Sequence, residues 1–302
     1  MSYSDLPYSD VMKKASIANA SGSDFWLVAP ERTMLKSAKP VIAICAVRTG
    51  SGKSQTARYV SKLLRDMGVK VVIIRHPMPY GILKDQKVER FSSMKDLDKY
   101  KTTIEEREDY EPHIRNRFIL YAGVDYEEIL RAAEKEADIL IWDGGNNDAP
   151  FIKPNLFITV ADPLRAGNEL TYYPGVTVAR MANAIIINKV NSATVQELRL
   201  LENNIRQINK NAKIIYADSV VTPDNPKLDV ELPAMGYSVK QIRDLQTTIN
   251  NADCDIVVSA TPTNLRNIIN INKPIVQVNY ELKPRSNMFD KMIKEFVADV
   301  KK

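Results

Sequence analysis

Residues 41–56 read VIAICAVRTGSGKSQT: an apolar run, a short loop with two glycines, and the start of a helical pattern. Only 11 glycines occur in the whole chain, so the placement of Gly50 and Gly52 in one loop is informative. Glycines let successive backbone N–H groups point at phosphate oxygens, and a helix that begins near Ser54 directs its positive dipole end to the same place. We therefore predict a phosphate-binding loop in which Lys53 reaches the β- and γ-phosphates and Ser54 offers its hydroxyl to Mg²⁺.

The loop departs from the usual G-x-x-x-x-G-K-S pattern, because Val47 occupies the first glycine position. The strand–loop–helix context is still the one that the pattern requires, and the alternative is a helix cap that carries Lys and Ser by chance. The residues expected to contact the nucleotide are Thr49, Gly50, Ser51, Gly52, Lys53, Ser54 and Gln55.

Arg48 adds a cation five residues before Lys53. With it, the loop resembles the K-G-G-x-G-K-[ST] loop of the NTPase class that includes the nitrogenase iron protein, with Arg in place of the first Lys. This resemblance implies that Arg48 contacts phosphate across a homodimer, a role to which a planar guanidinium is suited. The alternative is that Arg48 pairs with a nearby carboxylate.

Short apolar runs recur along the chain and are continuous rather than alternating, which is typical of strands buried on both faces of a parallel sheet. They occupy residues 41–47, 69–74, 139–142, 156–160, 184–187, 213–216, 256–259 and 275–278, with 25–28 as a further candidate. Helical patterns lie at 53–67, 126–137, 194–208, 238–250 and 288–300. This alternation predicts the α/β class: a doubly wound, mostly parallel sheet of the P-loop NTPase type.

Three segments are expected from this pattern. Residues 1–37 form an N-terminal helix and strand, 38–221 the P-loop NTPase domain, and 222–302 a smaller C-terminal α/β unit. Prolines in 222–233 indicate a linker between the last two. Residues 76–123 are polar, rich in tyrosine and without a clear strand, so we interpret them as a substrate-side insertion.

Polar residues follow two other predicted strands. Asp143 ends the run 139–142, as a Walker B carboxylate that holds Mg²⁺ does; the alternative is an N-capping aspartate. Asn188 and Lys189 begin the segment NKVN, which resembles the guanine motif N-K-x-D and places both residues near the base. Asn191 replaces the acidic residue that accepts two hydrogen bonds from guanine, which favours ATP over GTP, although GTP stays possible.

Composition narrows the function classes. A net charge of +5 without a basic cluster argues against nucleic-acid binding and suits an enzyme whose ligands are polyanions. Two isolated cysteines favour a reducing, cytoplasmic compartment, and no ligand spacing indicates a zinc site. No apolar stretch approaches the ~20 residues of a membrane span, and the N-terminus lacks a signal-peptide pattern.

Several motifs together resemble the cyclic 2,3-diphosphoglycerate synthetases and their relatives, often described as predicted GTPases. The matching segments are 46–56, 72–81, 103–114, 121–126, 142–148, 161–163, 172–175 and 232–237. The resemblance extends over nearly the whole chain. Two features of the family are missing here: a further N-terminal α/β domain, and a segment of several dozen residues between positions 227 and 230.

The resemblance implies a Mg²⁺/ATP-dependent enzyme that closes an intramolecular phosphoanhydride in 2,3-bisphosphoglycerate and releases ADP and phosphate. Such chemistry depends on positioning and charge neutralisation. The residues expected to act in catalysis are Arg48, Lys53, Arg75, His76, Glu105, Arg107 and Asp143, with Ser54 and Asp143 as metal ligands. Arg165 is a further candidate cation, and Asp148 and Asp162 could orient Mg²⁺ or an arginine.

A nucleotide switch is the alternative: an ATPase or GTPase whose hydrolysis drives binding of a protein partner or metal delivery. A switch needs few cations beyond its nucleotide loop. Arg75, His76 and Arg107 in the insertion therefore favour a second anion, a small phosphorylated acid, over a protein partner.

Overall fold

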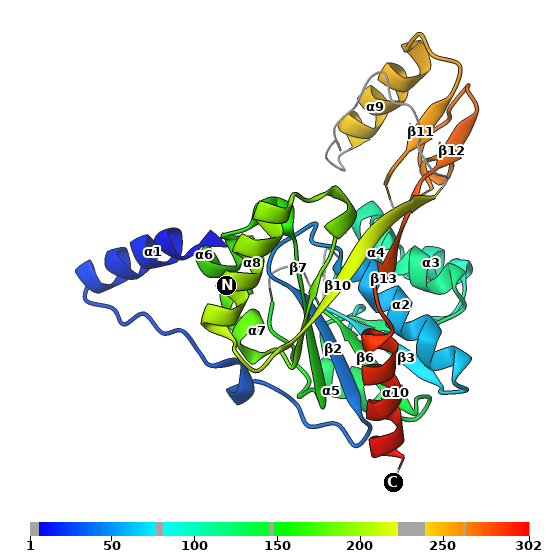
Figure 1. Cartoon of the computed structure of the whole chain (residues 1–302). Coiled ribbons are helices and arrows are strands. Elements are labelled where there is room, and N and C mark those ends of the chain that lie inside the picture. The colour runs from blue at the N-terminus through cyan, green and yellow to red at the C-terminus, as the bar shows by residue number, and fades with distance from the viewer. Residues whose placement is uncertain (1–5, 77–80, 145–147, 223–238, 262–263, 302) are drawn as a thin grey trace. The chain divides into compact units, whose positions relative to one another are not determined.

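The computed structural model describes residues 6–76, 81–144, 148–222, 239–261 and 264–301 (Figure 1). The chain divides into two compact units. The first contains residues 1–89, 121–219 and 282–302, and the second contains 90–120 and 220–281. Each is described separately below.

A nine-stranded sheet carries the predicted site. Its order is β13-β10-β9-β7-β2-β6-β3-β5-β4, with β2 in the interior. Strands β10, β9, β7, β2, β6 and β3 pair in parallel. The bounds are β13 Asn279–Pro284, β10 Lys213–Thr222, β9 Ala184–Ile187, β7 Leu156–Ala161, β2 Val41–Ala46, β6 Ile139–Asp143, β3 Val71–Arg75, β5 Ile119–Ala122 and β4 Glu89–Phe91.

The central strands are continuously apolar because both of their faces are covered. Every residue of β2, β6 and β7 is buried, which explains why these strands show no alternation of polar and apolar residues. Ile44 lies beside Asp143, and Asp143 lies beside Arg75 in the next strand. Parallel strands end at one edge, so the residues after β2, β3, β6, β7 and β9 gather there.

Helices cover this sheet. Helix α2 (Lys53–Asp66) packs on β2, β3, β6 and β7, and α10 (Met288–Val300) packs against α2, as Figure 1 shows. Tyr59 of α2 stacks on Phe289 of α10, with ring centroids 5.6 Å apart, and donates a 2.6 Å hydrogen bond to Asp290. This unit also contains α5 (Tyr126–Glu134), α6 (Asn168–Thr171), α7 (Gly175–Met181) and α8 (Val195–Ile208).

The N-terminal segment contains α1 (Tyr8–Ala20) and the two-residue strand β1 (Leu6–Pro7). Strand β1 pairs antiparallel with β8 (Tyr172–Tyr173), and the rings of Tyr8 and Tyr173 meet edge to face. The expected helix is therefore present, but the apolar residues 25–28 form no strand and Trp26 is 74% exposed. Without a neighbouring strand to pair with, an apolar run is not enough to make a strand.

The second unit contains α3 (Met94–Lys99), α4 (Ile104–Arg115), α9 (Val239–Asn251) and the parallel pair β11 (Val257–Ser259) and β12 (Ile275–Gln277). Capping boxes begin both α3 and α4. In α4, the Glu106 carboxylate accepts a 2.6 Å hydrogen bond from the Thr103 N–H, while Thr103 Oγ1 accepts from the Glu106 N–H.

The eight main strand predictions are confirmed, with boundaries that shift by up to two residues at most ends and with β10 extending six residues further than expected. The expectation that 76–123 contains no clear strand is wrong: Glu89–Phe91 forms β4 and Ile119–Ala122 forms β5, which lies next to β3 in the sheet. The segment also contains α3 and α4, whose polar first turns make the helical pattern hard to recognise in the sequence.

Residues 282–302, expected in the C-terminal unit, belong to the first unit. The linker prolines in 223–233, with Asn146 and Asn147, lie outside the described residues.

Candidate active site

The predicted phosphate loop connects β2 to α2, as its sequence requires. Gly52 adopts a φ of 107°, a conformation that favours glycine. A Cβ at this position would lie 2.0 Å from Nδ2 of Asn188, so the close approach also excludes a side chain. Asn188, which is fully buried, donates a 3.0 Å hydrogen bond to the Ser51 carbonyl. Asn188 therefore supports the loop, and the base contact expected of it stays a prediction.

Val47, at the missing glycine position, is part of the core. Its side chain is 4% exposed and joins a cluster that includes Ile185, Ile187 and Leu201. Its N–H donates to the Val160 carbonyl at 3.0 Å, which keeps the chain in line with β7. The substitution is tolerated because the turn starts after this residue, at positions 50 and 52.

Arg48 lies against residues of its own chain. Its Nη1 donates a 2.6 Å hydrogen bond to Oδ1 of Asn168, and its guanidinium carbon lies 4.3 Å from the ring centroid of Tyr172. Neither partner is a carboxylate, so these two contacts are not the carboxylate pair considered as the alternative. A cation–π contact of this kind orients the guanidinium beside the loop.

Lys53 and Asp143 are in direct contact. The Lys53 ammonium lies 2.5 Å from Oδ1 of Asp143, and both side chains are 2% exposed. Arg75 approaches the same carboxylate at 3.4 Å and donates to the carbonyls of Asp143 and Gly144. The register of β2, β6 and β3 sets this arrangement, which brings together three of the residues predicted to act.

Arg75 is held at the end of β6 by hydrogen bonds to the backbone, and its predicted part in catalysis stays a prediction. It is 1% exposed, and its hydrogen bonds to two carbonyl groups fix the chain at the end of β6. A guanidinium in this position orients Asp143 and neutralises part of its charge. Arg75 therefore acts as a support of the Walker B aspartate in this structure.

Ser54 and Asp143 supply the oxygen ligands that Mg²⁺ prefers. Ser54 is the second residue of α2, and Asp143 ends β6. Among the described residues, no group of three or more His, Cys, Asp or Glu could hold a metal ion by itself. These two residues fit a Mg²⁺ ion whose remaining ligands are phosphate oxygens and water, which is usual for this metal. Gln55 is tied to Ser219 by a 3.1 Å hydrogen bond from its Nε2.

A second group of charges lies at the ends of β7 and β9. Asp162 is 3% exposed, and its Oδ2 accepts from Nη2 of Arg165 at 2.9 Å and from Nζ of Lys189 at 2.7 Å. Nη2 of Arg165 lies 3.1 Å from where a Cβ on Gly50 would be, so this guanidinium lies against the phosphate loop. Asp162 thus orients an arginine, one of the two roles that its position suggested.

Asp148 is a site residue that the sequence only hinted at. It is 8% exposed, and neither carboxylate oxygen accepts a hydrogen bond from any described residue. Nδ1 of His76 lies 3.3 Å from Oδ2. Trp142 Nε1 also has no hydrogen-bond acceptor within the described ranges. A buried carboxylate costs free energy unless it is hydrogen-bonded or paired, which makes Asp148 a candidate for binding a ligand.

The thiol of Cys45 lies close to this group. A Cβ on Gly144 would be 3.3 Å from Sγ of Cys45 and 3.0 Å from Oδ1 of Asp148. Burial, followed by the charge of Asp148, raises the pKa of the Cys45 thiol well above its usual value. This shift favours the protonated thiol over the thiolate.

Two predicted residues lie in the second unit. Glu105 is in the first turn of α4, and Arg107 forms ion pairs with Asp98 and, at 3.9 Å, with Glu111. Burial raises the pKa of Glu111. These contacts are internal to the unit and account for the charge run at 105–111 as helix-stabilising pairs and a cap.

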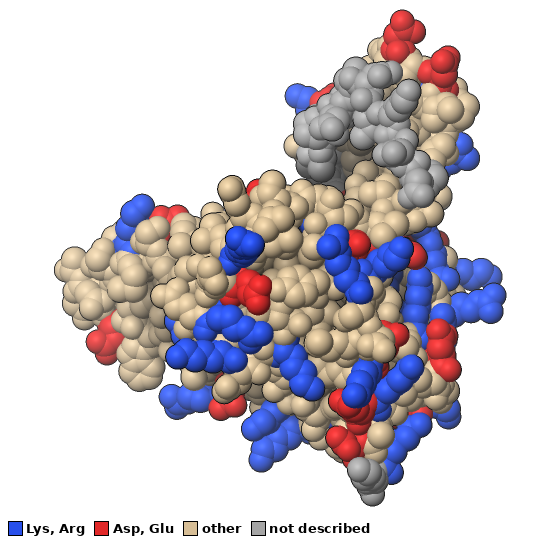
Figure 2. All heavy atoms as spheres, in the orientation of Figure 1, with Lys and Arg blue, Asp and Glu red and all other residues tan. Residues whose placement is uncertain are grey.

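No helix among the described residues is long and apolar enough to cross a membrane. On the face shown in Figure 2, lysines and arginines are spread among acidic side chains and form no single stripe.

No family model matches the chain. The solved structure of LpxK from Aquifex aeolicus in complex with ATP superimposes with a TM-score of 0.57 at 15% identity, covering 97% of this chain and 98% of that one. This likeness establishes the fold alone: a P-loop NTPase fold with a large, mostly parallel sheet and flanking helices.

A much stronger relationship appears in sequence. The arginine synthetase ArcE of Thermococcus kodakarensis is 47% identical over 338 positions, which cover 93% of this chain and 75% of the relative. The matched region is longer than this chain of 302 residues, so the relative has residues inside it that this chain lacks. Identity at this level over this length leaves one conclusion: the chain belongs to the family of the arginine synthetase ArcE.

Proposed function

We propose that this protein is a Mg²⁺/ATP-dependent synthetase that forms arginine by phosphoryl activation of a precursor. The observation that carries the proposal is the buried contact of Lys53 with Asp143 beside the phosphate loop, in a member of the arginine synthetase family. When a nucleotide binds with its metal ion, Lys53 would contact the phosphate and Asp143 would contact Mg²⁺. The ion pair between the two side chains would then be replaced by contacts to the ligand.

The product in the relative's name, arginine, limits which phosphoryl-transfer reactions are possible. A phosphoryl-transfer site assists arginine formation most directly if the precursor is the ureido analogue, which has an oxygen where arginine has a nitrogen. The ureido oxygen attacks the γ-phosphorus and ADP leaves. Ammonia then attacks the ureido carbon, and the oxygen departs with inorganic phosphate. ATP, the ureido amino acid and ammonia are thereby converted to arginine, ADP and phosphate.

Several residues of this chain support those steps. Lys53 and the loop N–H groups would neutralise and orient the transferred phosphoryl group, and Arg165, held by Asp162, lies against the loop to add a second cation. Asp148 lies in the polypeptide five residues beyond Asp143 and is buried. Its carboxylate suits a nitrogen ligand, because ammonium and guanidinium donate hydrogen bonds to carboxylates.

Isotope transfer tests this proposal. The purified chain is incubated with ATP, Mg²⁺, ammonium and citrulline that carries ¹⁸O in its ureido group. We expect arginine by chromatography and ¹⁸O in the released phosphate by phosphorus NMR, both lost in Lys53→Ala. Phosphate without the label, or no arginine, would contradict the mechanism. Parallel runs with GTP decide the base preference.

The cyclic 2,3-diphosphoglycerate reaction is the second candidate, supported by the motif resemblance of segments such as 72–81 and 103–114. Its expected cations are less available than predicted, because Arg75 bonds to carbonyl groups and Arg107 to carboxylates of the second unit. Adding 2,3-bisphosphoglycerate to the same assay tests it. An upfield phosphoanhydride signal would favour this reaction, while phosphate release indifferent to both substrates would favour a nucleotide switch.

A further inference from the structure

Asp148 is a buried charge that the contacts around the phosphate loop leave unexplained. It is 8% exposed, and neither carboxylate oxygen accepts a hydrogen bond from a described residue. Nδ1 of His76 lies 3.3 Å from Oδ2, a contact that is an ion pair only when the imidazole is protonated. Oδ1 lies 3.0 Å from the position that a Cβ on Gly144 would occupy. A carboxylate buried to this extent needs a donor or a cation to offset its desolvation.

Asp148 lies at the same edge of the sheet as the phosphate loop. Gly144, which it approaches, directly follows Asp143 at the end of β6. Sγ of Cys45, in β2, lies 3.3 Å from the same Cβ position. Burial has the largest effect on the pKa of this thiol, and four charged residues act on it in addition, in decreasing order: Asp148, Lys53, Asp143 and Arg75. One atom near the end of β2 is thus within electrostatic reach of Asp148 and of the lysine of the phosphate loop.

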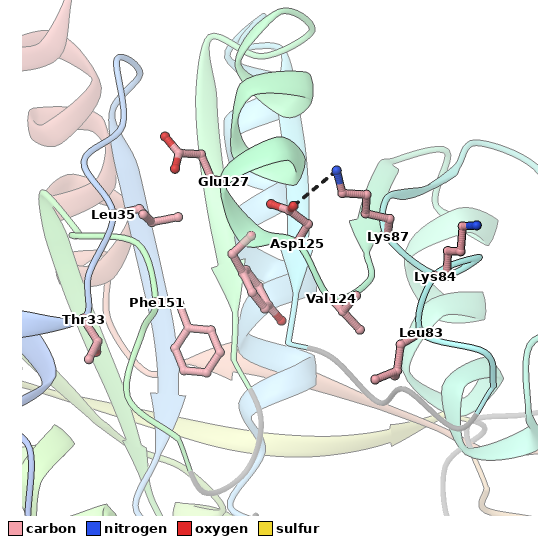
Figure 3. A pocket seen from close by; sticks show the side chains of 10 residues that line it. Thr33, Leu35, Leu83, Lys84, Lys87, Val124, Asp125, Glu127 and Phe151 are labelled. Carbon is pink, nitrogen blue, oxygen red and sulfur yellow. Dashed lines mark ion pairs between the residues drawn. The ribbon is translucent and has the colours of Figure 1, made fainter.

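A buried aromatic side chain lies beside the carboxylate. Nε1 of Trp142 lies 2.7 Å from the Cβ position on Gly144, and Trp142 is 0% exposed. Its ring centroid lies 5.6 Å from that of Tyr126 and 5.4 Å from that of Phe151, two residues that line the open pocket of about 870 Å³ in Figure 3. Asp148 therefore borders a low-dielectric region, where a carboxylate attracts a cation more strongly than in water.

The chemistry of this group selects a small cation that donates hydrogen bonds. Among the described residues no set of three or more His, Cys, Asp or Glu could hold a metal ion, so the oxygen ligands that Mg²⁺ or Ca²⁺ takes are missing. Ammonium needs no such set, because one carboxylate balances its charge and accepts its hydrogen bonds. An imidazole nitrogen without a proton accepts a further one, and Nδ1 of His76 lies close by. Because so little of Asp148 is exposed, an ion about the size of water is favoured over a larger amine.

We propose that Asp148 binds the ammonium ion that supplies the new nitrogen in the reaction proposed above, on which this inference rests. The carboxylate accepts hydrogen bonds from the ion and positions its nitrogen at the edge of the sheet where the phosphoryl group is transferred.

The attack proceeds with a simple proton balance. The nitrogen forms a bond to the carbon of the phosphorylated ureido group, and the bond from that carbon to the phosphate oxygen breaks, so that phosphate leaves with the electron pair. Of the four ammonium protons, one passes to Asp148 and then to solvent, and one leaves with the phosphate. The other two stay in the guanidinium group. Asp148 thus both orients the nucleophile and accepts the proton that frees its lone pair.

Steady-state kinetics of the full chain test the proposal, with ammonium, ATP and citrulline varied in turn and arginine measured by chromatography. We expect Asp148→Asn to raise the KM for ammonium about 100-fold, because the amide lacks the charge that pairs with the ion. The KM values for ATP and citrulline should stay within about threefold, since neither substrate loses a partner. Asp148→Glu keeps the charge and should raise the KM for ammonium by about tenfold at most, so the ammonium dependence can be read in two variants.

Hydroxylamine separates loss of the cation site from general damage. It is a nucleophile that is largely uncharged at neutral pH and needs no anionic partner. With hydroxylamine, formation of hydroxyarginine by Asp148→Asn, measured by mass spectrometry, should fall by about tenfold at most, the share expected from the lost proton acceptor. The matched control is Asp138→Asn, an exposed carboxylate that accepts a hydrogen bond from the Lys70 N–H, and it should change none of these values.

Two results would overturn the ammonium site and leave the proposed function standing. One is a KM for ammonium that stays within about threefold in Asp148→Asn, and the other is an equal loss with ammonium and with hydroxylamine. Either would make Asp148 a structural partner of His76. If the unaltered chain forms no arginine from citrulline, ammonium and ATP, the proposed function fails and the ammonium site with it.

Discussion

In the phosphate loop, Lys53 is 3% exposed and already contacts a buried carboxylate, whereas in the pocket of Figure 3 Lys84 is exposed and has no ion-pair partner among the described residues. Hydrogen bonds fix the side chains around the loop: Asn188, Gln55 and Arg75 each bond to a neighbouring residue. The charged side chains of the pocket are mostly exposed to solvent. The difference teaches that buried contacts preorganise a loop, whereas exposed charges are screened by water and contribute little to a fixed geometry.

The largest expected effect comes from Lys53→Ala. Arginine formation should fall by about 10³-fold or more, because a buried cation aimed at the transferred phosphoryl group is lost. The free energy of unfolding should also fall by about 3 kcal/mol, since Asp143 loses its nearest charge partner in a buried site. Turnover is measured by phosphate release, and stability by denaturant titration. The control Lys294→Ala should change neither; an active Lys53→Ala would refute the nucleotide site.

Asp148→Asn separates function from stability. We expect arginine formation to fall about 100-fold, by analogy with other groups that position a reactant, while the free energy of unfolding stays equal or rises by about 1 kcal/mol. The gain arises because an amide is cheaper to bury than an unbonded carboxylate. The control is Asp138→Asn, an exposed carboxylate that accepts a hydrogen bond from the Lys70 N–H. A less stable enzyme with unchanged turnover would make Asp148 a structural partner of His76 only.

Asn188→Ala tests whether the phosphate loop depends on the hydrogen bond that Asn188 donates to the Ser51 carbonyl. Loss of the hydrogen bond to Ser51 and the cavity that results should weaken ATP binding about tenfold and reduce stability by about 2 kcal/mol. Asn191→Ala is the matched control: its side chain bonds to the backbone of Ser219 at the exposed surface. If Asn188→Ala altered the ratio of ATP to GTP affinity instead, the base contact predicted from sequence would be correct.

The smallest effect is expected at Asp125. The Glu128 N–H, and then Lys87, hold the pKa of this carboxyl below its usual range. Because the folded pKa is the lower one, ionised Asp125 stabilises the fold above the unfolded pKa of about 3.9, and this contribution disappears as the pH falls through the folded value. Asp125→Asn keeps a capping side chain. Its melting temperature should lie slightly below that of the unaltered chain at pH 6 and approach it below about pH 4. A gap that does not narrow as the pH falls below about 4 would contradict the assignment.

The parts of the site that depend on residues adjacent in the chain could be predicted from the sequence. The loop at 48–55 and the strand tip at Asp143 lie where the pattern placed them, because a phosphate loop is a backbone device set by neighbouring glycines and one lysine. The insertion at 76–123 was not readable in the same way. Strand β5 has only four residues, and the capping boxes of α3 and α4 put charged residues where an apolar pattern is sought.

Sequence alone therefore determined the fold class, and it predicted where the phosphate loop and the Walker B carboxylate lie in the chain, since each depends on residues close together in the chain. Tertiary structure decided which charged side chains are buried against other residues and which can reach a ligand. It placed Arg75 and Asn188 in the interior as supports and buried Asp148 without a hydrogen-bond donor among the described residues. It also assembled a pocket from segments up to about 120 residues apart, from Thr33 to Phe151. The physical reason is that hydrogen bonding and burial are set by neighbours in space, which strand order and register choose.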